Sequence, residues 1–178
     1  MGSARRKFDP ATPRPPLGPD RLRAIAIRYV ERYQTTRQRL LRLLRRKLRE
    51  RGWEEGLDPP DLEALVEQMA GLGYVNDEAF AEARTRSMAR RGLGRSRIAA
   101  DLQASGIDAE TRSALLEATD PWESALAFAR RKRLGPFGAP ITEPKQRARQ
   151  LAAFARAGHP QALAARILGA ETVEDLAF

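Results

Sequence analysis

Apolar residues recur along this chain with the spacing of amphipathic helices, and no segment shows the period-two alternation of a β-strand. The clearest stripe falls at i, i+3, i+4, i+7, i+8 and i+11 and consists of Leu22, Ile25, Ala26, Tyr29, Val30 and Tyr33. Because these positions share one face of a helix, we expect them to be buried together. The pattern predicts an all-α protein.

Residues that favour helix starts and ends divide the chain into nine helices. Asn, Asp and Thr favour the N-cap, Pro is tolerated at the first helical position, and Gly favours the residue after the last turn. The expected starts lie at Asp20, Thr35-Thr36, Asp58-Pro59, Asn76, Arg95, Asp108, Asp120-Pro121, Thr142 and Pro160. Asp58 and Thr142 are thus predicted to be the N-caps of the third and eighth helices.

The nine helices fall into three groups, and the middle helix of each group is expected to end at Gly52, Gly106 or Gly158, at spacings of 54 and 52 residues. This repeat predicts three tandem three-helix modules at 20–73, 74–119 and 120–169. A disordered Pro- and Arg-rich arm is expected at 1–19 and a C-terminal tail at 170–178. Because a helix triplet buries little surface alone, the modules are expected to stack into an elongated, curved array. Trp122, at the second module junction, is expected to be a buried structural residue.

Composition excludes several classes of function. The 178 residues contain no Cys and one His, which removes disulfides, thiolate chemistry and a multi-histidine metal site. No Gly is followed by Lys, so a Walker A phosphate loop is absent, and Gly92-Leu93-Gly94 is better explained as a helix end and a tight turn. His159 precedes Pro160 and is interpreted as a helix-start residue. We therefore expect no enzyme activity, no cofactor and no metal.

Uncharged stretches reach only nine residues, whereas a membrane-spanning helix needs about 18 apolar residues, so we expect no membrane segment. The absence of Cys fits a cytoplasmic protein. The formal net charge is +9, and it is unevenly spread: residues 1–51 hold 16 Lys and Arg against four acids, whereas residues 52–178 hold 16 against 19. Such asymmetry indicates a polyanionic or acidic partner.

The basic residues gather in three clusters, which are the candidate binding residues. The first is one face of the second helix, Arg39, Arg42, Arg46 and Arg49. The second is Arg84, Arg86, Arg90, Arg91, Arg95 and Arg97, and the third is Arg130, Arg131, Lys132 and Arg133. Guanidinium groups bind phosphates and carboxylates through paired hydrogen bonds, although each cluster could equally be a solvated helix face. Aromatic residues are not interleaved with the arginines, so a platform for stacking bases is not expected.

The segment from Gly73 to Ala81 reads GYVNDEAFA, which resembles the GYLDDEAFA segment of the RecX regulatory proteins. The resemblance continues through Arg84, Arg86, Arg90-Arg91-Gly92, Gly94, Arg97-Ile98, Leu102 and Gly106-Ile107. It implies a bacterial, cytoplasmic protein of tandem three-helix modules that binds the RecA–DNA filament. It further implies that the protein restrains filament extension, ATP hydrolysis and strand exchange in recombination, DNA repair and the SOS response. We also expect the protein to be a monomer. The alternatives are a general DNA-binding protein that contacts phosphates, and a helical scaffold with no nucleic-acid role.

Overall fold

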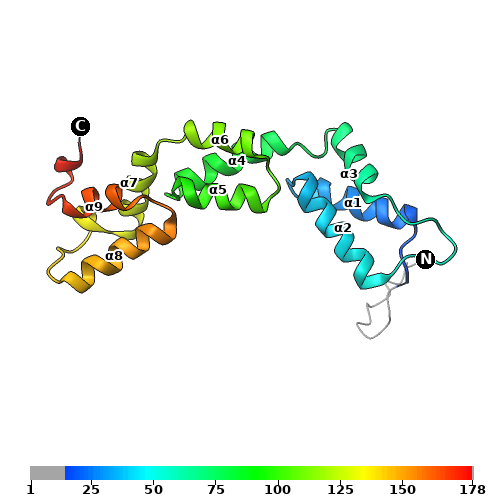
Figure 1. Ribbon diagram of the computed structural model, residues 1–178, viewed down its shortest axis with the longest axis horizontal. Helices are drawn as coiled ribbons and strands as arrows, with labels where there is room; N and C mark the ends of the chain where they lie inside the picture. The colour runs from blue at the N-terminus through cyan, green and yellow to red at the C-terminus, as the bar shows by residue number, and fades with distance from the viewer. Residues whose placement is uncertain (1–14, 178) are drawn as a thin grey trace, which may run out of the picture. The chain divides into compact units, whose positions relative to one another are not determined.

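The computed structural model describes residues 15–177, and this part of the chain is helical, with one isolated β-bridge between Leu17 and Trp53. Nine α-helices follow in order (Figure 1): α1 Pro19–Arg32, α2 Arg37–Arg51, α3 Leu62–Gly71, α4 Asp77–Arg90, α5 Arg95–Ala104, α6 Ala109–Glu117, α7 Pro121–Lys132, α8 Pro144–Ala157 and α9 Gln161–Gly169. Two short 3-10 turns lie at η1 Gly135–Phe137 and η2 Glu174–Leu176. The predicted all-α class is confirmed.

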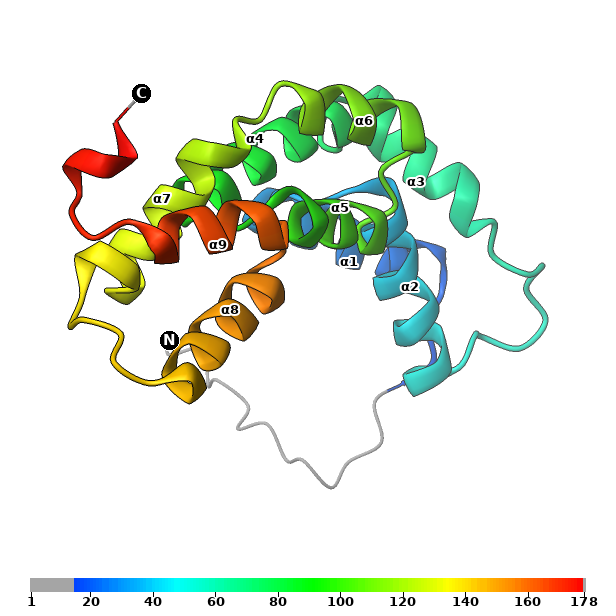
Figure 2. The same cartoon turned by 60° about the vertical axis from the view of Figure 1, so that its left-hand side comes forward.

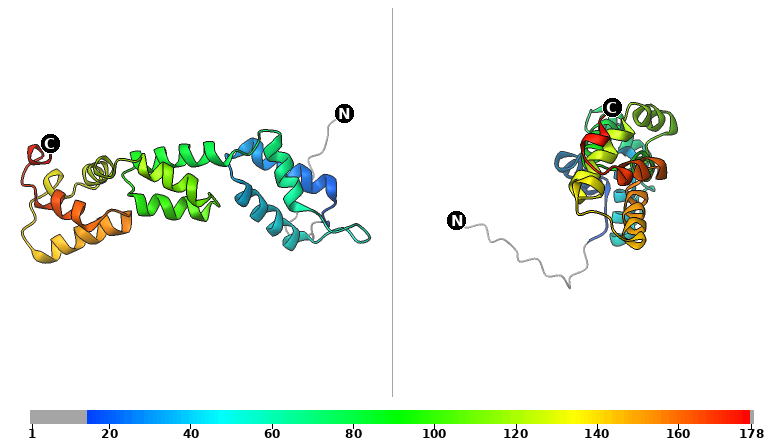
Figure 3. Two further views of the ribbon diagram at one scale, coloured as in Figure 1. Left: turned by 45° about the horizontal axis from the view of Figure 1, so that its top comes forward. Right: turned by 90° about the vertical axis from the view of Figure 1, so that its left-hand side faces the viewer.

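The chain forms two compact units, unit 1 up to Val75 and unit 2 from Asn76 onward. In unit 1, α1, α2 and α3 pack together around a core that includes Ala26, Leu40, Leu44 and Met69 (Figure 3). In unit 2, α4, α5 and α6 surround a second core, and α7, α8 and α9 surround a third (Figure 2). The module boundaries and the elongated array stay predictions.

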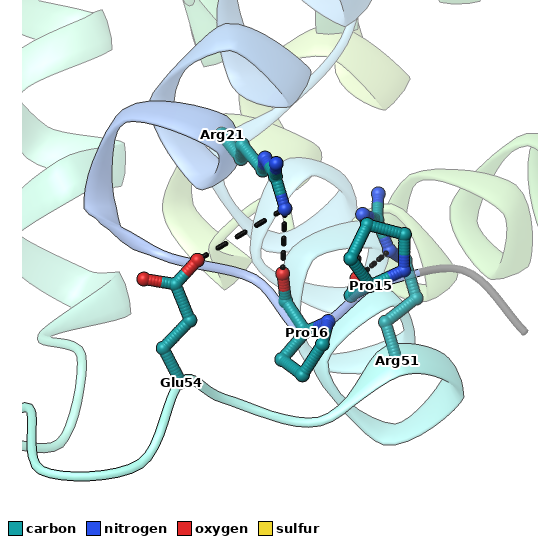
Figure 4. A network of polar contacts seen from close by, with 5 residues as sticks. All are labelled: Pro15, Pro16, Arg21, Arg51 and Glu54. Atoms are coloured by element: carbon teal, nitrogen blue, oxygen red, sulfur yellow. Dashed lines mark hydrogen bonds and ion pairs between the residues drawn. The ribbon is translucent and has the colours of Figure 1, made fainter.

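The segment just before α1 differs from its prediction as part of a disordered arm. The side chain of Leu17 is fully buried, its backbone N–H donates to Gly52 O (3.0 Å), and its carbonyl accepts from Glu54 N (3.1 Å). The Arg51 guanidinium donates to Pro15 O at 2.7 and 3.0 Å (Figure 4). Residues 15–19 therefore belong to unit 1, and the rest of the predicted arm, 1–14, lies outside the described residues.

Three predicted helix starts are wrong, and each lies near a proline. α1 begins at Pro19 after Gly18, before the predicted start at Asp20, because proline fits the first helical position. The cap of α3 is Asp61, whose Oδ1 accepts from Ala64 N at 2.8 Å, and not Asp58. A residue that precedes Pro is disfavoured in the helical region, so the pair Pro59-Pro60 delays the helix. In the same way α8 begins at Pro144 after Glu143, and not at Thr142.

Caps with a simple local signal are confirmed. Asn76, Asp108 and Asp120 each accept a hydrogen bond from a backbone N–H in the first turn of α4, α6 and α7, at 2.8–2.9 Å. The hydrogen bonds from Thr111 also lower the pKa of Asp108, since they stabilise its carboxylate. Such caps contribute about 1 kcal/mol each to helix stability.

Two aromatic residues are less buried than their helical positions predict. Tyr33 ends the apolar stripe of α1 but is 48% exposed, with the guanidinium of Arg32 lying 5.4 Å from its ring centre. Trp122 is half-buried against the core of α7–α9, and the Arg166 guanidinium covers its ring at 4.6 Å. In both cases a guanidinium group lies against the ring.

None of the helices in residues 15–177 is long and apolar enough to cross a membrane. Within the same residues, no three His, Asp or Glu side chains gather in a way that could hold a metal ion.

Candidate functional site: a basic groove in unit 2

The site depends on a close backbone contact between the α4–α5 turn and the helices α7 and α8. Gly92 ends α4 with a φ of +71°, and a Cβ at this position would lie 2.6 Å from Phe128 Cα. Gly94 begins α5 and donates its N–H to Ala157 O at 2.8 Å. A Cβ on Gly94 would overlap the Gly158 carbonyl, so glycine at both positions lets the backbones meet.

His159, which follows α8, makes a second contact with the α4–α5 turn. Its side chain is buried, and its Nε2 lies 3.0 Å from Gly92 O, 67 residues away in the chain. Since a carbonyl only accepts, Nε2 carries the proton, and Nδ1 has no hydrogen-bond partner among the described residues. Burial lowers the pKa of His159, and the hydrogen bond to Gly92 only partly opposes this effect. His159 is therefore a neutral core residue and not merely the start of a helix.

Beside this junction lies a groove of about 850 Å³, which we call the basic groove. Its apolar lining consists of Leu93, Phe128, Leu134, Ala153 and Ala157. Its cationic lining consists of Arg97 from α5, Arg131 and Lys132 from α7, and Arg156 from α8. Helices from both halves of unit 2 thus contribute to one concave surface.

The four cations of the basic groove are exposed, and no carboxylate lies within ion-pair distance of their side chains in residues 15–177. No acidic residue lines the groove. Unpaired cations in a concave surface with apolar walls attract anions more strongly than cations that are already neutralised by a neighbour. The arrangement can bind phosphate or carboxylate groups.

The first predicted cluster lies on α2, where acids compensate part of the charge. Arg46 pairs with Glu50 at 3.6 Å, and Lys47 pairs with the same carboxylate at 2.6 Å. Arg37 and Arg45, on the same helix, pair with acids of α3. Of the predicted members, Arg42 and Arg49 are exposed and Arg39 is half-buried.

The second cluster is divided by the fold. Arg84 is held by two hydrogen bonds of 2.8 Å to the carboxylate of Asp101, which raises the pKa of Arg84. Arg86 pairs with Glu82 at 3.1 Å. The Arg95 guanidinium donates to the carbonyls of Thr119 and Glu117 at the end of α6.

Arg84 and Arg95 therefore hold helices together, contrary to the expectation of a free basic face, because packing of α4, α5 and α6 brings acceptors to them. Arg90 and Arg91 are exposed at the end of α4. Neither lines the basic groove, whereas Arg97 does.

The third cluster supplies Arg131 and Lys132 to the basic groove. Arg130 instead lies 5.5 Å from the ring centre of Phe137, and the exposed Arg133 adopts a left-handed conformation as it ends α7. The fourth groove cation, Arg156, was not predicted. It is a single Arg in an alanine-rich stretch, and only the packing of α8 against α7 places it beside the others.

The chain resembles known proteins over most of its length. A family model described as the second three-helix domain of RecX matches residues 76–116. The Regulatory protein RecX of Myxococcus xanthus is 34% identical over 161 residues, which cover 85% of this chain and 86% of that protein. The Regulatory protein RecX of Agrobacterium fabrum is 30% identical over 153 residues, covering 84% and 82%.

A solved structure agrees in fold. The crystal structure of RecX from Lactobacillus salivarius aligns with a TM-score of 0.61 at 15% identity, covering 84% of this chain and 94% of that one. The sequence relatives match residues of both units, and the three-helix domain model matches α4, α5 and most of α6. By this similarity the chain belongs to the RecX family of regulatory proteins.

Proposed function

We propose that this protein binds the RecA–DNA filament and restrains filament extension, ATP hydrolysis and strand exchange in recombination, DNA repair and the SOS response. As a regulator of a cytoplasmic recombinase it acts in the cytoplasm, as a monomer and without a cofactor or catalysis of its own. The observation that carries the proposal is the basic groove, a set of four unpaired cations inside a chain of the RecX family.

The chemistry of the groove supports binding to an anionic assembly. A nucleoprotein filament offers both DNA phosphates and protein carboxylates, and four unpaired cations can bind either. Arg42, Arg49, Arg90 and Arg91 are further exposed cations outside the groove. These could reinforce attachment through nonspecific attraction to DNA.

The test is to add the protein to RecA assembled on single-stranded DNA and to follow ATP hydrolysis and filament length. We expect the wild type to inhibit hydrolysis at a substoichiometric ratio to RecA. Tight binding to duplex DNA with no effect on RecA would contradict the proposal and would favour the general DNA-binding alternative.

A further inference from the structure

We infer that the basic groove binds an acidic segment of a protein partner that carries an apolar anchor residue, in preference to the phosphate backbone of DNA. The inference adds detail to the proposed function. It rests on the proposed function only for the identity of the partner protein, which would be RecA. The chemistry of the segment is argued from the groove itself.

The groove has two kinds of surface that a single ligand must satisfy. Leu93 and Leu134 are half-buried and leave apolar surface at the groove, and the cations of α5, α7 and α8 line the same space. A peptide with a leucine flanked by carboxylates would cover the apolar surface and pair with the cations at once. A phosphodiester backbone would pair with the cations but would leave the apolar surface exposed to water.

The groove also lacks what a single DNA strand requires. Proteins that bind single-stranded DNA without sequence preference hold its bases by stacking them on exposed aromatic rings. The aromatic residue in the groove lining, Phe128, is only 5% exposed, and its ring packs against Phe154 and His159 at centroid distances of 5.1 and 5.5 Å. A strand laid in the groove would therefore have phosphate contacts and no place for its bases.

The backbone that presents the cations is held in place before any ligand arrives. The Gly94–Ala157 hydrogen bond and the His159–Gly92 hydrogen bond join the element that bears Arg97 to the helix that bears Arg156. A ligand with fixed spacing between its charges gains affinity from such preorganisation. The bidentate geometry of guanidinium groups suits carboxylates, and three of the four cations are arginines.

Fluorescence anisotropy with two labelled peptides tests the inference. One peptide alternates glutamate with leucine, and the other has the same glutamates but serine in place of leucine; labelled oligothymidylate is the nucleic-acid probe. The groove variant is Arg131→Glu with Arg156→Glu, and Arg131→Gln with Arg156→Gln is a milder version. The matched control is Lys145→Glu with Arg149→Glu, which makes the same charge change on exposed side chains of α8 that do not line the groove.

We expect the leucine peptide to bind the wild type at least tenfold more tightly than the serine peptide. We expect its affinity to fall at least tenfold in the groove variants and to change little in the control, with helix content preserved in all of them by circular dichroism. Equal affinity for the two peptides would overturn the inference, because binding would then need charge alone. An equal loss in the control would also overturn it, as would an oligothymidylate affinity that falls only in the groove variants while peptide binding persists.

The recombinase assay separates this inference from the proposed function. If the wild type binds the leucine peptide through the groove but leaves RecA unaffected, the proposed function fails and the groove assignment stands. If the wild type restrains RecA and the groove variants restrain it equally, the groove assignment fails and the proposed function stands.

Discussion

Replacing Gly94 with Ala tests whether the backbone contact at the α4–α5 turn holds unit 2 together and forms the basic groove. Gly94 has a φ of −77°, which alanine adopts without strain, so the substitution changes only the space around the Cβ. The new Cβ would lie 2.8 Å from His159 N and would overlap the Gly158 carbonyl. Both neighbours are backbone atoms and cannot rotate away as a side chain could.

The expected cost follows from this geometry. Overpacking of a tight site typically reduces the free energy of unfolding by about 1–3 kcal/mol. Because the neighbours here are rigid backbone atoms, we expect a loss of about 3 kcal/mol for Gly94→Ala. To make room for the Cβ, the α4–α5 turn must move away from the end of α8. This movement stretches the Gly94–Ala157 hydrogen bond and contributes to the cost. With a urea m-value of about 1.5 kcal/mol/M, the unfolding midpoint of unit 2 should fall by about 2 M.

Urea unfolding should be followed by the fluorescence of Trp122 in a Trp53→Phe background, so that the signal comes from unit 2 alone. Gly71→Ala is the contrasting glycine substitution, and its effect on unit 1 should be followed by the fluorescence of Trp53 in a Trp122→Phe background. Gly71 lies within α3, and its Cβ would meet no heavy atom within 4 Å, so helix propensity should stabilise unit 1 by about 0.5–1 kcal/mol. An unchanged midpoint for Gly94→Ala, with unchanged peptide binding, would refute the role of the contact.

Two further predictions concern buried and partly buried polar groups. Because the pKa of His159 is lowered in the folded protein, its contribution to stability is fully present above the usual value near 6.5 and is lost as the pH falls towards the folded pKa. The melting temperature of unit 2 should therefore fall between about pH 8 and about pH 5.5, and this dependence should weaken in His159→Gln; an equal dependence in both proteins would assign it to other groups. Arg84→Ala should reduce the free energy of unfolding by about 1 kcal/mol, because Asp101 loses two charged hydrogen bonds in a partly exposed site. Arg86→Ala, which breaks a more exposed pair within α4, should cost only about 0.3 kcal/mol, and equal costs in urea unfolding would contradict a structural role for Arg84.

The helices could be predicted because their signals are local. Asn76, Asp108 and Asp120 cap helices through bonds to residues two or three positions away, so the sequence contains both partners. The errors at Asp58 and Thr142 also have a local origin, since prolines one or two positions later, Pro59-Pro60 and Pro144, move the start of the helix beyond the first capping residue. The family resemblance is also local, because it rests on one continuous segment from Gly73 to Ile107.

The basic groove could not be predicted in the same way, because its partners come from distant parts of the chain. Arg97 and Arg156 are 59 positions apart, and only the glycine contact between their turns brings them to one surface. The loss of Arg84 as a candidate has the same cause, since Asp101 reaches it through the packing of α5 on α4. Charge clusters in a sequence show where cations are, but not which acids will meet them.

The pairing of cations with acids in the fold explains why the more acidic part of the chain contains the stronger candidate for an anion site. Residues 1–51 have the larger excess of basic residues, yet Arg37 and Arg45 are paired there with the α3 acids Glu67 and Glu63. Acids outnumber basic residues in 52–178, but several have other roles: Asp108 and Asp120 cap helices, and Asp101 binds Arg84. No acid lines the basic groove, so no carboxylate of the lining compensates the charge of its cations. Affinity for an anion depends on this local balance more than on net charge, because screening limits charge interactions to about 8–10 Å in physiological salt. Reversal of two groove arginines should therefore weaken anion binding more than the same charge change elsewhere in unit 2.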